Sequence, residues 1–173
     1  MTERVKNVLV VYASRLRSTA ETATFIADQL TIEGATVVVK AVDEVSALNV
    51  YDLVIVGSAI RYDRWLPEAV EFVQSNQAAL SKRKIAYFFT CLTFAEKTEV
   101  TENKAANYAE KLQQLAPELR PISIGRFGGV LNSKKGPWMT RALLRLLSYA
   151  TGLKEGDYRD WNQISEWAKA LRF

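Results

Sequence analysis

The sequence predicts a doubly wound α/β fold, in which a parallel sheet of five strands is covered by helices on both faces. The length of 173 residues suits one domain, at about 150 residues per domain. Apolar residues make up 49% of the chain, which is enough to build a core. Short apolar runs rich in β-branched and aromatic residues alternate with segments of helical periodicity, as in parallel sheets joined by crossover helices.

The strands are predicted at residues 8–12, 36–42, 53–56, 85–89 and 122–127. The helical periodicity is carried by Ala20, Ala23, Ala27 and Leu30 after the first strand, Ala69, Phe72, Val73 and Leu80 after the third, Ala105, Tyr108, Leu112 and Leu115 after the fourth, and Ile164, Trp167, Ala168 and Leu171 at the end. Pro67 suits the first turn of the second helix. Ligands of such sheets bind beyond the carboxyl ends of the strands, so the loops after strands 1, 3 and 4 form the predicted site.

The composition excludes several kinds of chemistry. The chain has no histidine, which removes the usual triad base and the most frequent metal ligand. Its single cysteine, Cys91, excludes an intrachain disulfide, an all-cysteine zinc site and a cysteine-ligated iron-sulfur cluster. We therefore expect no metal, and any redox chemistry must use an organic cofactor. The sequence assigns no catalytic residue.

The positive charge is concentrated in one segment. The chain carries 23 Lys and Arg against 19 Asp and Glu, a net charge of +4. Residues 125–154 contain six basic residues and no acid, which leaves 17 basic against 19 acidic residues elsewhere. The six are Arg126, Lys134, Lys135, Arg141, Arg145 and Lys154. No recognition motif accompanies them, so we expect no nucleic-acid partner.

No segment has the roughly 20 apolar residues that span a bilayer, and the first apolar run is too short for a signal-peptide core. These observations predict a cytoplasmic protein, and contact with a membrane surface remains open.

The loop after the first strand is rich in hydroxyl groups and leads into a helix. Its residues Ser14, Arg15, Leu16, Arg17, Ser18 and Thr19 are the predicted phosphate site. A helix N-terminus offers unpaired N–H groups and partial positive charge to an anion. The three-glycine dinucleotide fingerprint and the lysine-bearing phosphate loop are both absent, which favours a mononucleotide phosphate without hydrolysis. The alternative is a capping box, with Ser18 and Glu21 satisfying helix donors reciprocally.

A longer set of motifs resembles the flavodoxin-like FMN-binding domains, with order 2-1-3-4-5 for the five strands. It is most similar to their quinone-dependent protoporphyrinogen dehydrogenase branch. The matching segments are Tyr12-Ala13-Ser14, Ser18-Thr19, residues 51–62, Cys91-Leu92-Thr93, Asn107-Tyr108-Ala109, residues 128–131 and Asp160-Trp161. The similarity runs from about residue 5 to residue 171 and makes the whole chain one such domain. It departs at Arg17, where many relatives have glycine; a positive φ there would cost about 1 kcal/mol.

The resemblance implies how FMN would be bound. The segment after the third strand would line the isoalloxazine with Ser58, Ala59, Ile60 and Arg61, and the segment after the fourth with Cys91, Leu92 and Thr93. Tyr62 and Trp65 offer aromatic faces for stacking, although Trp65 before Pro67 also suits a packing residue at a helix entry.

Arg61 and Arg64 suit an anionic flavin or substrate carboxylates, and they equally suit solvated surface positions. Cys91 is expected to be an inert buried thiol, because the chain has no second cysteine and no histidine to lower its pKa.

Residues 128–153 form a basic insertion, longer than the usual connection between a strand and a helix. Residues 138–149 have helical character, with the apolar residues Leu143, Leu144, Leu146 and Leu147 and with Arg141 and Arg145 one turn apart. Such a segment binds anionic lipid headgroups or, alternatively, packs as a cap on the core. Relatives of the dehydrogenase branch have an insertion here, a substrate with two propionates and a membrane quinone as acceptor.

We therefore predict an FMN-dependent oxidoreductase that passes electrons from a tetrapyrrole-like substrate to a quinone. The alternative is an electron-transfer flavodoxin that serves a redox protein partner and has no substrate of its own. A cofactor-free interaction module on the same fold is the third hypothesis. Flavodoxin carriers are by resemblance usually acidic, so the basic insertion favours the enzyme.

Overall fold

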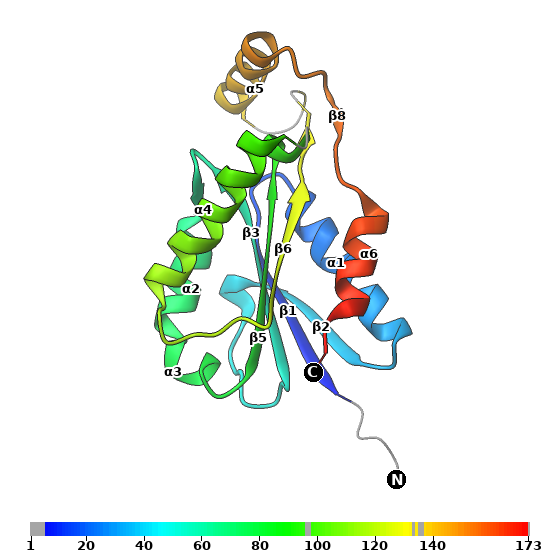
Figure 1. Cartoon of the computed structure of the whole chain (residues 1–173), viewed down its shortest axis with the longest axis vertical. Coiled ribbons are helices and arrows are strands. Elements are labelled where there is room, and N and C mark those ends of the chain that lie inside the picture. The colour runs from blue at the N-terminus through cyan, green and yellow to red at the C-terminus, as the bar shows by residue number, and fades with distance from the viewer. Residues whose placement is uncertain (1–5, 96–97, 133, 135–136, 173) are drawn as a thin grey trace.

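The computed structural model describes residues 6–95, 98–132, 134 and 137–172. Five parallel strands form the central sheet in the order β2-β1-β3-β5-β6 (Figure 1). They are β1 (Asn7–Ala13), β2 (Thr36–Ala41), β3 (Leu53–Arg61), β5 (Lys84–Cys91) and β6 (Ser123–Gly128). A two-residue strand, β4 (Arg64–Trp65), pairs antiparallel with the end of β3. The predicted fold class and strand order are confirmed, and β3 runs five residues further than the sequence indicated.

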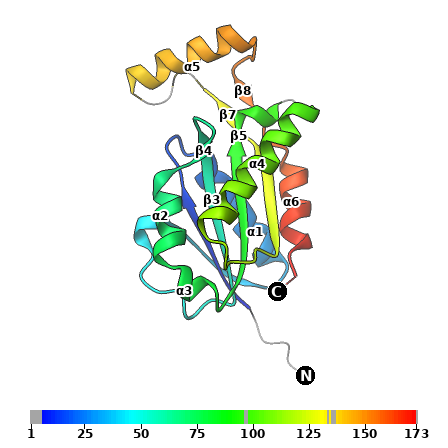
Figure 2. The same ribbon diagram turned by 60° about the vertical axis from the view of Figure 1, so that its left-hand side comes forward.

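Helices cover both faces of the sheet, as Figures 1 and 2 show. One face carries α1 (Ser18–Ile32) and α6 (Trp161–Ala170), and the other carries α2 (Pro67–Ser75), α3 (Gln77–Leu80) and α4 (Glu99–Leu115). The single helix expected after the third strand is divided at Asn76. Its amide side chain donates to the Phe72 carbonyl at 2.8 Å, which offers the backbone an alternative to a continuous helix.

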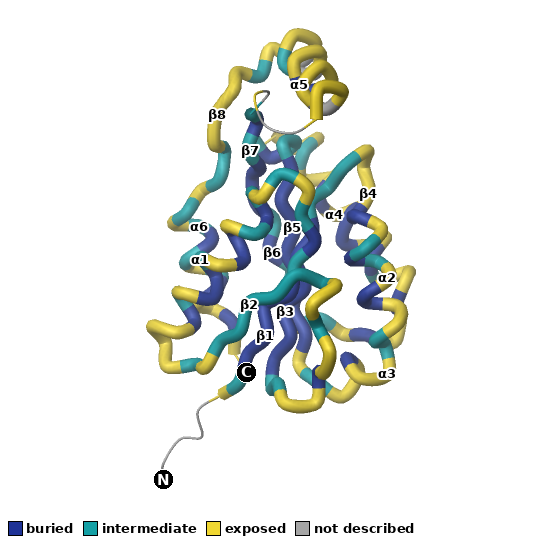
Figure 3. Tube along the Cα trace, turned by 180° about the vertical axis from the view of Figure 1, so that it is seen from behind, coloured by how far each residue is buried: buried dark blue, intermediate teal, exposed yellow. Residues whose placement is uncertain are grey.

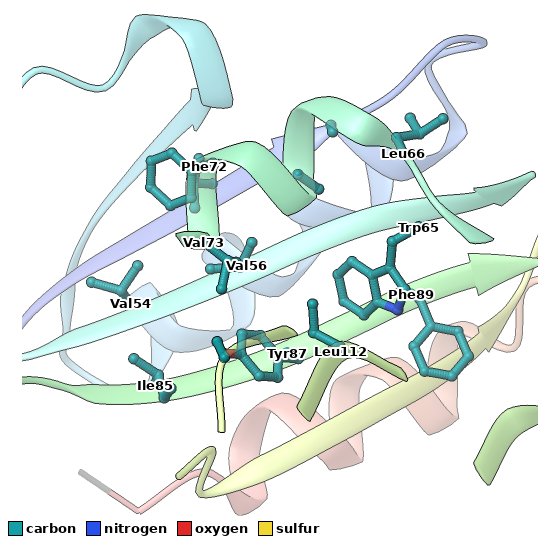
Figure 4. Close-up of a cluster of buried hydrophobic side chains, with 14 of the residues drawn as sticks. Val54, Val56, Trp65, Leu66, Phe72, Val73, Ile85, Tyr87, Phe89 and Leu112 are labelled. Atoms are coloured by element: carbon teal, nitrogen blue, oxygen red, sulfur yellow. The ribbon is translucent and has the colours of Figure 1, made fainter. Parts of the chain in front are cut away.

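Alternating side chains divide the core between the two faces. In β1, Val8 and Val10 pack with α1 and α6, whereas Leu9 and Val11 pack with α2 and α4. The three central strands β1, β3 and β5 are buried on both sides, which is why they read as continuous apolar runs. Figure 4 shows part of the cluster on the side of α2 and α4. There the centre of the Trp65 ring lies 5.9 Å from that of Phe89, and the two ring planes meet at a steep angle.

The insertion forms a separate small unit at the carboxyl end of the sheet (Figure 2). Strands β7 (Val130–Leu131) and β8 (Gly156–Asp157) pair antiparallel at the base of this unit. In the sequence, α5 (Trp138–Thr151) lies between these two strands. A Cβ atom on Gly128 would lie 2.0 Å from the Tyr158 carbonyl oxygen, so only glycine allows the two stems to approach so closely. The helix predicted within the insertion is confirmed.

Within the described ranges, no helix combines the length and the hydropathy needed to cross a membrane.

Candidate functional site

A cavity of about 400 Å³ lies at the carboxyl ends of the central strands. Ten of the predicted site residues line it: Ser14, Arg15, Leu16, Ser18, Ala59, Ile60, Arg61, Cys91, Leu92 and Thr93. They come from the loop after β1 and the start of α1, from the last residues of β3, and from the end of β5 with the segment that follows it. The fold therefore brings together the three loops that the sequence singled out.

Three predicted residues do not line this cavity. Thr19 is fully buried, and its hydroxyl lies 2.8 Å from that of Thr90 in a hydrogen bond. Ser58 is also fully buried; its hydroxyl donates to the Ala59 carbonyl at 2.9 Å and accepts from the Leu66 N–H at 3.0 Å. The Arg17 side chain is exposed. Thr19 and Ser58 hold the loops in shape, and their hydroxyls are already engaged.

The first loop presents a row of main-chain amides. No N–H group of residues 15–20 donates a hydrogen bond to any residue that the structure describes. Arg17 precedes α1 in the left-handed conformation, with φ 70° and ψ −17°. The positive φ considered for Arg17 is therefore present, directly before the first turn of α1. Such a row suits an anion.

The capping box considered as the alternative is not formed. The N-cap residue is Arg17 and α1 has no side-chain cap, because Ser18 is already within the helix. Glu21 instead forms an ion pair with Arg159, with 2.9 Å between Oε2 and the guanidinium nitrogen.

Ser14 supplies a further group for an anion. Its hydroxyl oxygen is shielded from solvent and has no hydrogen-bond partner among the described residues. A buried hydroxyl without a partner is costly, so a bound acceptor would stabilise it. Arg15 lies next to it and forms an ion pair with Glu68 of α2.

Arg159 supports the start of α1 from the far end of the chain. Its guanidinium donates to the Ser18 carbonyl at 3.1 Å and to both carboxylate oxygens of Asp157, at 2.8 and 2.6 Å. It also lies 4.4 Å from the centre of the Trp161 ring. The hydrogen bond from Arg159 lowers the pKa of Asp157, which keeps the cluster ionised.

The hairpin between β3 and β4 forms one wall of the cavity. Tyr62 and Asp63 occupy its turn and line the cavity, with Arg61 beside them. Trp65 was offered as an aromatic face for the ring; it lies in the core instead, with 5% exposure. Arg64 lines a separate groove between α2 and α4, so the two arginines do not act as one pair at the cavity.

The opposite wall contains Cys91 and Thr93. The Cys91 thiol donates to the Thr93 hydroxyl at 3.1 Å and accepts from the Thr93 N–H at 3.4 Å. Burial raises the pKa of the Cys91 thiol above its ordinary value. The thiol is therefore protonated at neutral pH, in keeping with the expected inert role.

The insertion contributes the roof. Leu143 and Leu144 of α5 line the cavity, and Leu144 is 9% exposed. The rest of α5 is mostly exposed (Figure 3). Its exposed large apolar side chains among the described residues are Trp138, Met139, Leu143, Leu146 and Tyr149, and Arg141 and Arg145 are also exposed. Packing as a core cap accounts for one face of α5 alone. Lys135 lies outside the described residues.

A model of the flavodoxin domain matches residues 9–156. The chain belongs to the flavodoxin domain family. It is 26% identical to the protoporphyrinogen IX dehydrogenase [quinone] of Escherichia coli K12, over 94% of this chain and 93% of that protein. The same protein from Escherichia coli O157:H7 matches equally well.

Solved flavodoxins share the fold of this flavodoxin domain. A flavodoxin from the domain Archaea has a TM-score of 0.52 and 17% identity, covering 94% of this chain and 99% of its own. A short-chain flavodoxin associated with a bacterial microcompartment has a TM-score of 0.58 and 12% identity, with 95% coverage of both chains.

Sequence reasoning missed several cavity residues in this flavodoxin domain. These are Asp63 in the hairpin turn, Thr90 near the end of β5, Gly129 and Val130 after β6, and Leu143 and Leu144 in the roof; Tyr62, expected as an aromatic face, does line the cavity. The segment after β6, the last strand of the sheet, reaches the same sheet edge as the segments after β1, β3 and β5. This position could have indicated Gly129 and Val130 from the sequence. Across the described ranges, no group of three or more His, Cys, Asp and Glu side chains could hold a metal ion.

Proposed function

We propose that the cavity binds FMN, with the phosphate on the amides of residues 15–20 and the ring between the two walls. The observation that carries this proposal is the row of unpaired amides beside the partnerless Ser14 hydroxyl. A phosphate supplies the acceptors that these donors lack. The small side chain of Ala59 and the apolar roof of Leu143 and Leu144 suit a flat ring.

We further propose that the protein oxidises a protoporphyrinogen-like tetrapyrrole and passes the electrons to a quinone. Bound FMN would supply the chemistry, which is acceptance of a hydride equivalent and its release as electrons. The relative at 26% identity carries this activity in its name. Arg61 at the cavity and Arg141 and Arg145 on α5 offer guanidinium groups to substrate carboxylates.

The residues of the chain bind, orient and exclude water in this proposal. Leu143 and Leu144 cover the cavity and keep solvent away from the reacting atoms, which strengthens electrostatic contacts there. Arg15 and Arg61 add positive charge at two sides of the cavity, and Thr93 is held against Cys91. The protein groups therefore position the substrate and the cofactor.

The quinone acceptor is proposed to reach the site from a membrane surface on which α5 lies. Its exposed side includes Trp138 at 75%, Leu146 at 64% and Tyr149 at 90% exposure, with Arg141 and Arg145 available for anionic headgroups. Leu146→Ser should weaken sedimentation with vesicles containing phosphatidylglycerol. Val100→Ser removes an equally exposed apolar residue from α4 and should leave it unchanged.

The deciding experiment is anaerobic mixing of the FMN-loaded protein with protoporphyrinogen IX. Loss of the oxidised flavin absorbance, followed by its return when a quinone is added, supports the proposal. If the absorbance of oxidised flavin persists, the proposed oxidation of protoporphyrinogen is refuted. Rapid electron exchange with a flavodoxin reductase would then favour the carrier alternative. If the protein is colourless after incubation with saturating FMN and removal of the free FMN, flavin binding itself is refuted.

A further inference from the structure

The cavity wall made by Tyr62 and Asp63 adopts a conformation that its residues disfavour. Their φ angles are 51° and 58°, and they join Arg61 of β3 to Arg64 of β4. A two-residue hairpin turn with both φ angles positive is a type I′ turn, which favours Asn-Gly. Neither position has glycine here. Aspartate tolerates this conformation better than tyrosine does, so a contact from outside the hairpin would stabilise the turn chiefly against the cost at Tyr62.

Tyr108 of α4 makes the contact that can do so. Its hydroxyl donates to Oδ1 of Asp63 at 2.5 Å, and its main-chain carbonyl accepts from the Trp65 indole N–H at 3.3 Å. One residue of α4 thus grips the hairpin on both sides of Arg64. The Lys111 ammonium also donates to the Asp63 carbonyl, at 3.4 Å.

The anchor itself is rigid. Tyr108 is 2% exposed, and its ring meets that of Phe89 edge-on at 5.8 Å. Burial, followed by the hydrogen bond to Asp63, raises the pKa of the Tyr108 phenol. The phenol therefore remains a proton donor across the physiological range.

We propose that Tyr108 is a positioning residue that latches the Tyr62–Asp63 turn in its left-handed conformation and so keeps one wall of the cavity ready for the flavin. This inference rests on the proposed binding of FMN. A flavin that requires the latched wall binds with an apparent affinity reduced by the fraction of molecules in which the wall is formed. Loss of the latch therefore weakens FMN binding without removing any contact to FMN.

Amide hydrogen exchange in the flavin-free protein tests the latch alone. Tyr108→Phe should raise the exchange rate of the peptide containing residues 61–65 by about tenfold, because the turn opens more often. Tyr87→Phe is the matched control. The Tyr87 hydroxyl is buried and has no partner within the described part of the chain, and the centre of its ring lies 6.0 Å from that of Trp65. Its removal should leave the exchange rate unchanged.

FMN titration tests the consequence, with a rescue built into the hairpin. Tyr108→Phe and Asp63→Ala should each raise the Kd for FMN by about tenfold, since both lose the latch and keep a Cβ atom at a positive φ. Asp63→Gly should remain within about threefold of the wild-type protein, because glycine adopts the turn without help. The double variant Tyr108→Phe/Asp63→Gly should recover the same affinity.

Recovery in the double variant supports the latch, since a general packing defect at Tyr108 would persist when Asp63 becomes glycine. Unchanged exchange and affinity in Tyr108→Phe, or a double variant as weak as Tyr108→Phe, would overturn it. A wild-type protein that binds no FMN refutes the proposed function instead, and the exchange measurement still decides on the latch.

Discussion

Two segments with left-handed residues border the cavity, and they are held in opposite ways. At the Tyr62–Asp63 turn the conformation is supported from outside, by Tyr108 and Lys111. In the phosphate loop, Arg17 has φ 70° and an exposed side chain, and the amides beside it have no partner among the described residues. The turn is thus preformed by the protein, whereas the loop keeps donors that an anion would satisfy. In the proposed FMN complex, pre-organisation would therefore be concentrated at the ring, and the hydrogen bonds gained on binding at the phosphate.

The largest effect should come from a negative charge in the phosphate loop. Ser18→Glu places a carboxylate where the phosphate is expected, and it should raise the Kd for FMN by at least about 100-fold. Riboflavin lacks the phosphate, so its affinity should change little. Thr24→Glu adds the same charge to the exposed side of α1 and should bind FMN almost normally. Equal losses for FMN and riboflavin would show that the loop does not hold the phosphate.

The loop also depends on Arg159, which holds the first turn of α1. Arg159→Met should lower the free energy of unfolding by about 2 kcal/mol, because a guanidinium that is 6% exposed leaves Asp157 and Glu21 without their partner. Urea denaturation measures this, with Arg172→Met at the exposed end of the chain as control. A change below about 0.5 kcal/mol would mean that the loop needs no such support.

Arg17 allows the strain in the loop to be measured. Arg17→Gly should raise the free energy of unfolding by about 1 kcal/mol, since glycine adopts a positive φ without steric cost. The Kd for FMN should stay within about threefold, because this side chain lies outside the cavity. Arg17→Ala removes the guanidinium but keeps Cβ, and it should give no gain. A gain in the alanine variant would assign the cost to charge rather than to the backbone.

The Asp157 carboxylate adds a pH dependence to this support. Arg159 lowers the pKa of Asp157 below its ordinary value of 3.8 in the folded protein. The resulting stability is complete above the unfolded pKa and is lost as the pH falls through the folded pKa. Asp157→Asn should therefore lose less stability than the wild-type protein between about pH 5 and pH 2. Parallel curves for the two proteins would contradict the ion pair.

The smallest effect is expected at the turn, from Lys111. Its contact to the Asp63 carbonyl is long and exposed, so Lys111→Met should change the free energy of unfolding by less than about 0.5 kcal/mol. Amide exchange at residues 61–65 should stay near the wild-type rate. Faster amide exchange in this variant would show that Lys111 rather than Tyr108 holds the turn.

The sheet and its site were predictable from local patterns. A strand buried on both faces shows a continuous apolar run, and the carboxyl ends of β1, β3 and β5 must meet at one edge. Knowing which loops meet was enough to place Ser14, Ile60 and Leu92 around one cavity. The departure at Arg17 likewise identified a positive φ, because relatives with glycine there indicate the required conformation.

Contacts between distant segments were not predictable. Ser18 and Glu21 match a capping box, but Arg159, 138 residues beyond Glu21, takes the glutamate for an ion pair. Tyr62-Asp63 lacks the Asn-Gly signal of a type I′ turn, since Tyr108 supplies from another helix what the local sequence lacks. The roof position of Leu144 follows from the path of the insertion, which periodicity within α5 does not reveal.

The pairing of β7 with β8 has a consequence for engineering. The two stems meet at Val130 and Asp157 in a two-residue ladder, and the Tyr158 N–H donates to the Gly129 carbonyl at 3.0 Å beside it. That juncture is a natural splice point: a short turn grafted between Leu131 and Gly156 would excise α5 and leave the five-stranded scaffold continuous. Conversely, other segments can be joined to the same stems, so that one five-stranded sheet carries different covering segments.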